Sequence, residues 1–322
     1  MGTLIAVDGG NSKTEVLVCD TGGAVLGHAL GPGTNHQTVG GVAEAMARLD
    51  RLIAEARAGL PGDDPPDVVV CCLAGADLPV ELATLTDAVA SANWATKSVL
   101  DNDTVALLRA GTDARDAVAV VCGEGINCVG RAADGRTVRF PALGPISGDW
   151  GGGGDIGRLA LWHAVRAEDG RGPDTALRFA VAVHFGLATA TDVAIAAHLD
   201  RAVAARVGEL APVVFREAAG GDRVARSIVV RQGEEVAAFA AAALRRLDLA
   251  ASPADVVLGG GVLRGRDPLL FSVIRDGLAA TAPHTRIRVV TAPPVVGAAL
   301  LGLDALGAPP QAAAALRRWS RP

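Results

Sequence analysis

Short apolar runs separated by glycine-rich turns occupy the first thirty residues of the chain. The runs Leu4–Val7, Val16–Cys19 and Ala24–Ala29 are divided by two segments that each contain a glycine pair. Apolar runs of this length with turn residues between them predict strands joined by hairpins. We therefore expect the chain to open with an antiparallel three-stranded meander.

Helical and strand patterns alternate after the meander. Apolar positions at helical spacing predict helices over Val42–Ala58 and Val80–Ala92. The wholly apolar run Val68–Ala74 predicts a buried strand, and Lys97–Leu100 predicts another. Pro, Gly and Asp fill Leu60–Asp67, so we expect a loop there.

The pattern restarts near residue 117. Strands are predicted over Ala117–Cys122, Cys128–Arg131 and Thr137–Phe140, and the spacing of the glycine turns between them nearly matches that of the first meander. We interpret the match as a structural duplication. The boundary between the copies is expected near Gly111–Asp116.

The remainder of the second copy is longer and mainly helical. Gly154–Leu247 reads as mostly helix, followed by strands over Asp255–Leu258 and Ile287–Val290 and a last helix over Pro294–Leu306. The tail to Pro322 is predicted to be a short helix or disordered. The pattern indicates an α/β protein of two similar lobes, 1–114 and 115–322, with ligands between them. An open alternative is that the last helix packs back on the N-terminal lobe.

Composition narrows the class of protein. The chain has 322 residues, a formal net charge of −5 and 50% hydrophobic residues, and it carries no long basic run, so no nucleic-acid partner is expected. It lacks a signal-peptide pattern and an apolar stretch long enough to span a membrane, so we expect a cytoplasmic protein without a membrane partner. Its five scattered cysteines have no zinc or iron–sulfur spacing and are expected to stay reduced.

The first candidate site is the glycine loop Asp8–Thr14 between two strands. Gly9 and Gly10 let the backbone turn tightly and aim N–H groups at one point, which suits a phosphate. Asp8 is placed to hold Mg²⁺ through water, and Lys13 adds positive charge. The alternative is an ordinary glycine hairpin.

A matching loop, Gly123-Glu124-Gly125-Ile126-Asn127, opens the second copy. Two such loops, one from each lobe, would hold the phosphates from both sides. Glu124 is an awkward member, because a carboxylate beside a polyphosphate is repulsive unless a cation intervenes.

A cluster of polar residues, Asp101-Asn102-Asp103, ends a predicted strand. Strand ends in α/β folds face the ligand crevice, and a carboxylate there can take the proton of an attacking hydroxyl in phosphoryl transfer. The alternative is that one of the two aspartates caps the next helix while the other acts.

Three further loops are candidates for ligand contacts. Asp149, in the segment Gly144–Gly154, is the polar group best placed to bind a sugar hydroxyl, although the segment could be only a mobile loop. Asn35 and His36 are a loop pair suited to sugar hydroxyls. The turn Gly259–Gly261 suits a nucleotide base or ribose, or is only a tight turn.

Together these motifs resemble the BadF/BadG/BcrA/BcrD ATPase family, and within it the N-acetylglucosamine kinases, over nearly the whole chain. The resemblance implies an α/β fold of two ribonuclease H-like lobes of the actin/Hsp70/sugar-kinase superfamily with an interlobe cleft. It implies ATP and Mg²⁺ as cofactors and transfer of phosphate to the C6 hydroxyl of N-acetylglucosamine or glucosamine, with Asp103 as catalytic base. The implied sugar contacts are Asn35, His36, Asp103, Gly144 and Asp149. The implied ATP contacts are Gly9, Gly10, Asn11, Ser12, Lys13, Gly123, Glu124, Gly125, Ala218, Gly260 and Gly265, with Asp8 on Mg²⁺ through water.

The chain departs from the family pattern in three places. Gly123-Glu124-Gly125 stands where the kinases commonly have Gly-Thr-Gly, so a hydroxyl that would touch phosphate is missing. Leu143 aligns with a Trp near the sugar in the mammalian enzymes. Gly148-Asp149-Trp150-Gly151 replaces Gly-Asp-Glu-Gly. These departures predict an altered sugar pocket.

Two other functions remain open within the resemblance. One is an ATPase activator of a 2-hydroxyacyl-CoA dehydratase, which would need cysteines on an iron–sulfur cluster between subunits. The other is a non-catalytic sugar sensor on the same fold. Since dimers are common among similar proteins, we also expect a homodimer.

Overall fold

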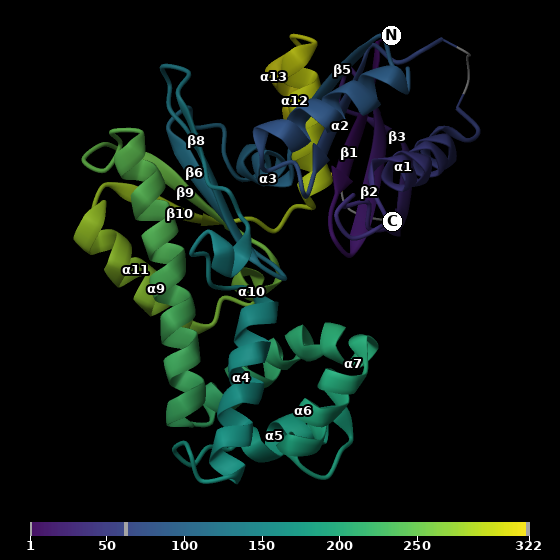
Figure 1. Cartoon of the computed structure of the whole chain (residues 1–322). Coiled ribbons are helices and arrows are strands. Elements are labelled where there is room, and N and C mark those ends of the chain that lie inside the picture. The colour runs from purple at the N-terminus through teal and green to yellow at the C-terminus, as the bar shows by residue number, and fades with distance from the viewer. Residues whose placement is uncertain (1, 61–63, 320–322) are drawn as a thin grey trace. The chain divides into compact units, whose positions relative to one another are not determined.

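The computed structural model describes residues 2–60 and 64–319, and the chain falls into two units that are not continuous in sequence. The first unit comprises Met1–Arg115, Arg139–Pro141 and Val290–Pro322, and the second comprises Asp116–Val138 and Ala142–Val289. Residues 61–63 of the predicted loop and residues 320–322 of the tail lie outside the described residues. Figure 1 shows the elements of both units.

The first unit is built on a five-stranded sheet in the order β3-β2-β1-β4-β5. Its strands are β1 (Thr3–Gly9), β2 (Lys13–Asp20), β3 (Val25–Pro32), β4 (Val68–Leu73) and β5 (Lys97–Asn102). β1, β2 and β3 pair antiparallel, as the meander predicted, whereas β4 is parallel to both β1 and β5. As a result β1, β3, β4 and β5 all end at one edge of the sheet.

Helices cover both faces of this sheet because its central strands are apolar on both sides. Alternate residues of β1 enter different cores: Leu4 and Ala6 pack with α12, whereas Ile5 and Val7 pack with α1. The helices of the first unit are α1 (Val42–Arg57), α2 (Pro79–Ser91), α3 (Asp103–Gly111), α12 (Pro294–Ala305) and α13 (Pro310–Leu316). The tail was predicted to be a short helix or disordered, and its described part contains the short helix α13.

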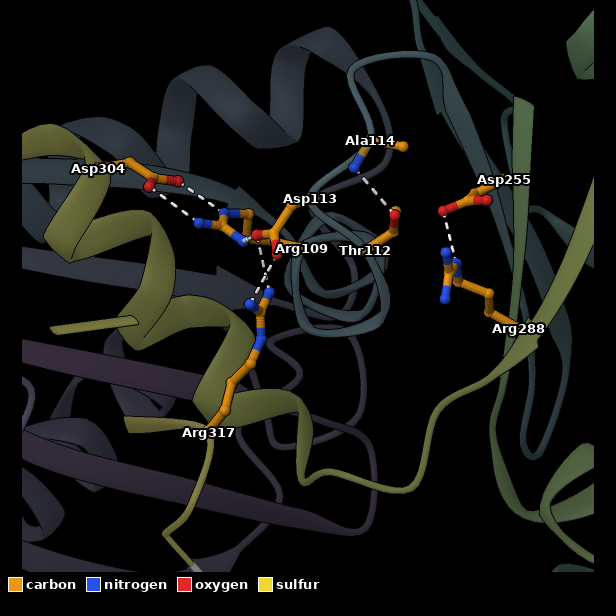
Figure 2. Close-up of polar contacts among 8 residues, drawn as sticks. All are labelled: Arg109, Thr112, Asp113, Ala114, Asp255, Arg288, Asp304 and Arg317. Atoms are coloured by element: carbon orange, nitrogen blue, oxygen red, sulfur yellow. Dashed lines mark hydrogen bonds and ion pairs between the residues drawn. The ribbon is translucent and has the colours of Figure 1, made fainter. Parts of the chain in front are cut away.

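Ion pairs join α3 to the C-terminal helices of the same unit (Figure 2). Arg109 on α3 binds both Asp304 on α12 and Asp113, and Arg317 after α13 also binds Asp113. Gly297 allows α12 to approach α3, since a Cβ there would lie 1.8 Å from the carbonyl oxygen of Ala106. These contacts fix the helix that begins at Asp103.

The second unit repeats the topology of the first. Its sheet has the order β10-β9-β6-β7-β8, which read from β8 gives the same sequence of strands as β3-β2-β1-β4-β5. Its strands are β6 (Ala117–Cys122), β7 (Ile126–Arg131), β8 (Thr137–Arg139), β9 (Ala254–Gly259) and β10 (Thr285–Val289). The predicted duplication is confirmed, and Arg288 on β10 binds Asp255 on β9 at 2.6 Å (Figure 2).

Helices between β8 and β9 make the second unit longer than the first. They are α4 (Gly153–Glu168), α5 (Leu177–Phe185), α6 (Ala190–Leu199), α7 (Arg201–Ala205), α8 (Ala211–Ala219) and α9 (Arg223–Arg246), with 3-10 turns at Gly144–Ile146 and Val207–Leu210. α10 (Gly261–Arg264) and α11 (Pro268–Thr281) connect β9 to β10. α9 packs on β6, β7 and α11, and α4 packs on α5 and α6. The prediction of a mostly helical segment over 154–247 is confirmed.

Among the described residues, no single helix is long and apolar enough to cross a membrane, although the bent pair α5–α6 passes the test of length and composition.

Candidate active site

Three loops and the start of one helix of the first unit gather at the edge where β1, β3, β4 and β5 end. They are residues 10–12, residues 33–41, residues 74–78 and the start of α3 at Asp103. Ligand sites of α/β sheets lie outside the carboxyl ends of the strands. The sequence motifs Asp8–Thr14, Asn35-His36 and Asp101–Asp103 therefore meet at the edge where a ligand is expected.

The first glycine loop is tightly packed against the segment that follows β3. Gly10 N donates to Lys13 O at 2.9 Å, and Thr34 N donates to Gly10 O at 3.1 Å. A Cβ at Gly9 would lie 2.6 Å from the Thr34 hydroxyl and 2.5 Å from a Leu73 methyl, so a larger residue would have to displace these side chains. Ser12 and Lys13 are exposed beyond this turn.

Asn35 is held by hydrogen bonds on both sides of its amide. Its Nδ2 donates to Asn11 Oδ1 at 2.7 Å, and its Oδ1 accepts from Gln37 N at 2.9 Å. The predicted phosphate-loop residue Asn11 and the predicted sugar-loop residue Asn35 are thus in direct contact. Beside them, the buried Nδ1 of His36 has no hydrogen-bond partner. An unpaired buried ring nitrogen is a place for a polar ligand group.

The three residues of Asp101-Asn102-Asp103 have different partners. Asp101 accepts an ion-pair hydrogen bond from Arg139. Asn102 caps α3, since its side chain accepts from Thr104 N at 3.0 Å. The expectation that one of the two aspartates is the cap is therefore wrong: the amide oxygen between them takes that role.

Asp103 is left as the carboxyl group that can change its protonation near neutral pH. Its pKa is raised from 3.8 to about 7, mainly by burial and further by the negative charge of Asp77, against the lowering effect of peptide N–H groups of α3. A carboxylate with a pKa near the operating pH suits a general base. Although protein largely surrounds its carboxyl group, the residue keeps some exposed surface.

Asp77 and Glu81 were missed by the sequence reasoning. Asp77 Oδ1 accepts from Asn102 Nδ2 at 2.9 Å, beside Asp103. Glu81, the third residue of α2, accepts from the N–H of Leu78 at 2.9 Å. A Pro at the first helical position with Glu two residues later is a helix-start signal that could have found Glu81.

Asp8 lies in a row of residues across three neighbouring strands. It pairs in register with Cys72 on β4, which pairs in turn with Asp101 on β5. In-register residues of parallel strands point to the same face. Asp8 is 8% exposed and supplies a hard oxygen donor of the kind that Mg²⁺ prefers, so this residue fits the predicted water-mediated metal contact.

In the second unit, the glycine loop 123–125 packs on the N-terminus of α4. Gly153 N donates to Gly123 O at 2.7 Å, and Gly154 N donates to Glu124 O at 2.9 Å. The carboxylate of Glu124 lies against Gly154 and Gly208, because a Cβ at either glycine would meet its oxygens within 2.8 Å. No atom would lie within 4 Å of a Cβ at Gly123 or Gly125, so the surface beside these two glycines is open.

Asp149 is buried within the segment that precedes α4. Its carboxylate accepts from the Ser147 hydroxyl, and its N–H donates to Gly144 O at 3.0 Å. Gly144 has a φ of +63°, a conformation that favours glycine. The structure therefore brings Gly144 and Asp149 together in one turn.

The predicted adenosine turn follows β9. Gly260 has a φ of +94°, and a Cβ there would lie 2.2 Å from Cys122 O, so glycine is required for the turn to pack on β6. Space is open at Gly265. Ala218 lies in α8 and is 3% exposed, so only its backbone or a small part of its methyl could reach a ligand.

Metal ligation by cysteine finds no support in the described part of the chain. All five cysteines are buried and free, and burial raises the pKa of Cys19, Cys71 and Cys122 to about 12. Within residues 2–60 and 64–319, no group of three or more His, Cys, Asp or Glu side chains is arranged to hold a metal ion. The predicted reduced state of the cysteines agrees with this burial.

The chain is similar to known proteins over most of its length. The sequence profile of the BadF/BadG/BcrA/BcrD ATPase family matches residues 5–302. The N-acetyl-D-glucosamine kinase of Dictyostelium discoideum is 26% identical over 315 residues, 93% of this chain and 97% of that protein. The N-acetylmuramic acid/N-acetylglucosamine kinase of Clostridium acetobutylicum is 26% identical over 287 residues, 88% and 92% of the two chains.

A solved structure shows the same fold. It is that of a proposed N-acetylglucosamine kinase from Chromobacterium violaceum, with a TM-score of 0.70, 25% identity and coverage of 94% of this chain and 99% of that one. The predicted α/β fold of the sugar-kinase superfamily is confirmed.

Proposed function

Because the chain belongs to the BadF/BadG/BcrA/BcrD ATPase family, we propose that it is an ATP-dependent amino-sugar kinase acting on the C6 hydroxyl of N-acetylglucosamine or glucosamine. One observation carries the proposal beyond the family. Asp103, with a pKa raised to about 7, lies at the same sheet edge as Asn35 and His36. A proton acceptor and groups for sugar hydroxyls are thereby offered by a single unit.

Asp103 is the catalytic base of this proposal. In its ionised form it accepts the proton of the sugar hydroxyl as that oxygen bonds to the γ-phosphorus of ATP and the bond from phosphorus to the bridging oxygen of ADP breaks. Asn35, His36, Gly144 and Asp149 would bind the other sugar groups. The unpaired Nδ1 of His36 supports this role, because a sugar hydroxyl would satisfy it.

The glycine turns would bind the nucleotide. Backbone N–H groups of Gly9–Lys13 and of Gly123–Gly125 would bind phosphate, and Gly260, Gly265 and Ala218 would contact adenosine. Mg²⁺ held through water by Asp8 would supply charge neutralisation at the phosphates. Glu124 has no hydroxyl to offer a phosphate, whereas a threonine at this position would have one, and its carboxylate adds a negative charge. Nucleotide binding should therefore depend strongly on Mg²⁺.

A coupled assay of ADP release over a panel of sugars tests the proposal. N-Acetylglucosamine, glucosamine, N-acetylmuramic acid and glucose should be compared, and the product should be examined for phosphate at C6. Asp103→Ala should lower kcat by at least about 100-fold, the usual contribution of a general base. Asp87→Ala, which removes an exposed aspartate from α2, is the matched control. Full activity in folded Asp103→Ala would refute the assignment.

The two alternative functions make different predictions. An activator of a dehydratase would need cysteine thiolates on an iron–sulfur cluster, and the burial of all five cysteines argues against it. A brown, oxygen-sensitive preparation would favour it. A sugar sensor would bind a sugar without releasing ADP.

We also propose that the protein is a cytoplasmic homodimer. Five of its large exposed apolar side chains lie on or beside α5 and α6: Phe179, Val183, Leu187, Ile195 and Leu199. Apolar surface of this kind marks interaction sites, and a second copy of the chain is the partner that we propose.

Light scattering should show a dimer that Val183→Glu weakens. Val80→Glu, at a comparably exposed valine of α2, should leave the mass unchanged. A monomeric wild type would refute the dimer.

A further inference from the structure

The predicted sugar loop and the predicted base follow the two outermost strands of one sheet, at the edge where both strands end. Asn35 follows β3 and Asp103 follows β5, which are the two outer strands of the order β3-β2-β1-β4-β5. The axes of these two strands are four strand spacings of about 4.8 Å apart, or roughly 19 Å in all. Something at the sheet edge must therefore set the position of one loop relative to the other.

The loop after β4, residues 74–78, lies against both of them. On one side is Gly75, where a Cβ would be 2.5 Å from Asn35 Oδ1 and 3.2 Å from His36 Cε1. On the other side Asp77 Oδ1 accepts from Asn102 Nδ2 at 2.9 Å, next to Asp103. This loop is the physical bridge between the two parts of the site.

Glu81 connects the bridge to the sugar loop. One carboxylate oxygen, Oε2, accepts from the N–H groups of Leu78 at 2.9 Å and Asp77 at 3.3 Å. The other, Oε1, accepts from Gln37 Nε2 at 2.6 Å. Gln37 in turn donates its backbone N–H to Asn35 Oδ1 at 2.9 Å. The contacts run without a gap from Asn35 through Glu81 to the Asp77 turn and Asn102.

We propose that Glu81 is a positioning residue that sets the sugar-binding loop, through Gln37, against the turn that supports the catalytic base. The proposal rests on the proposed kinase function. Each carboxylate oxygen of Glu81 accepts hydrogen bonds from a different loop, so this one side chain fixes the positions of both loops. Glu81 does not touch substrate and acts only through Gln37 and Asp77.

A simpler role for Glu81 is to cap α2, and Gln37 separates the two roles. Gln37→Ala removes the bond to the sugar loop and leaves the cap at Leu78 intact. If Glu81 positions the loop, Gln37→Ala should raise KM for N-acetylglucosamine about 2- to 10-fold, the typical net effect of one hydrogen bond, with KM for ATP unchanged. Gln311→Ala, at an exposed glutamine of α13, is the matched control.

Glu81 variants complete the test. Glu81→Ala should raise the same KM by a similar factor, and the double variant with Gln37→Ala should be no worse than the stronger single variant, since both remove one link. Glu81→Gln keeps an acceptor for Leu78 and can pair with a flipped Gln37 amide, so it should restore most of the affinity. Asp192→Ala is the control for a lost capping acid, because Asp192 accepts from Thr189 N at 3.1 Å at the start of α6. It should lower stability without changing either KM.

Calorimetric binding of N-acetylglucosamine gives a second readout that needs no turnover. If wild type binds the sugar but releases no ADP, the kinase proposal fails and the Kd values of the variants still decide the role of Glu81. Unchanged KM and Kd in both Gln37→Ala and Glu81→Ala would overturn the positioning role while leaving the kinase intact. Absence of any sugar binding by wild type would overturn both.

Discussion

The Arg109 guanidinium on α3 donates two parallel hydrogen bonds to the Asp304 carboxylate on α12, from Nε to Oδ2 at 2.7 Å and from Nη2 to Oδ1 at 3.0 Å. The two residues are 195 positions apart in sequence. Arg109 also binds Asp113, so its charge is shared by two carboxylates (Figure 2). The helix that carries Asp103 at its first residue is thereby tied to the C-terminal segment of the chain.

Replacing this arginine should loosen α3. Arg109→Met keeps the apolar stem and removes the guanidinium, and we expect a loss of about 1.5–3 kcal/mol in the free energy of unfolding, as for hydrogen bonds to charged groups. Urea denaturation of the variant gives the measurement. Arg275→Met, at an exposed arginine of α11, should change stability by less than about 0.5 kcal/mol. Equal losses in the two variants would contradict the anchoring role.

Close packing of α12 on α3 should make Gly297 intolerant of a side chain. A Cβ would lie 1.8 Å from the Ala106 carbonyl oxygen, which the helix backbone cannot move aside cheaply, so Gly297→Ala should cost about 1–3 kcal/mol. Gly302→Ala in the same helix meets the two methyl groups of the Leu4 side chain at 3.1 and 3.3 Å, rather than backbone, and should be milder. Thermal unfolding compares the two. A Gly297 variant as stable as the Gly302 variant would argue against this contact.

Activity should fall on the acid side of neutrality. A base with a pKa of about 7 is protonated below that pH, so kcat/KM should drop about tenfold for each pH unit further down. Asp77→Asn removes the neighbouring charge that raises this pKa and should move the acid limb to lower pH. Initial rates between pH 5 and 9 measure the shift. A limb that stays in place in Asp77→Asn would contradict the contribution of the Asp77 charge and leave burial as the cause of the raised pKa of Asp103.

Stability should depend on the same group with a definite sign. A raised carboxyl pKa means that the folded state holds its proton between pH 3.8 and about 7, whereas the unfolded state has lost it. The stabilising contribution is complete below pH 3.8 and is lost as the pH rises through 7. Asp103→Asn, which does not ionise, should match wild type near pH 4 and exceed its stability at pH 8.5 by at most about 4 kcal/mol, less where solvent screens the charge.

Denaturant titrations at these two pH values give the comparison. If wild type is the more stable protein at pH 8.5, the pKa of Asp103 is not raised.

The buried thiols should be unreactive in the folded protein. Burial raises the pKa of Cys71 to about 12, and that of Cys72 well above its ordinary value with help from Asp101 and Asp8. Thiolate is the reactive form, so a disulfide reagent at pH 8 should label native protein slowly and all five cysteines after denaturation. Rapid labelling of any native thiol would show that one of these strands opens readily.

The strands and the placement of the motifs could be predicted because they depend on local pattern. Runs such as Val68–Leu73 are apolar throughout, and glycine turns mark their ends. The sequence also led to Asp103, since a carboxylate that follows a buried strand lies at the edge of the sheet where ligands bind. The partition of roles within Asp101–Asp103 could not be predicted, because it depends on Arg139, which is 38 residues away in sequence.

Long-range partners also explain what was missed at Glu81. Its helix-start position is visible in the sequence, but its contact with Gln37 spans 44 residues and depends on the register of four strands. The sequence left open whether the last helix packs back on the N-terminal lobe, because nothing local to 290–322 decides it, and in the structure this segment belongs to the first unit. Sequence pattern thus identifies the elements, and tertiary packing decides which side chains meet.

That return of the C-terminal segment has a consequence for synthesis on the ribosome. Half of one core of the first unit comes from the end of the chain, including Val295, Leu300 and Leu303 packed against Leu4 and Leu17. The N-terminal strands emerge first yet must wait for almost the entire polypeptide before their apolar face is covered, whereas the second unit has all of its residues by position 289. The strands that are made first are therefore among the last to have both faces covered, and we expect their apolar face to stay exposed while most of the chain is being made.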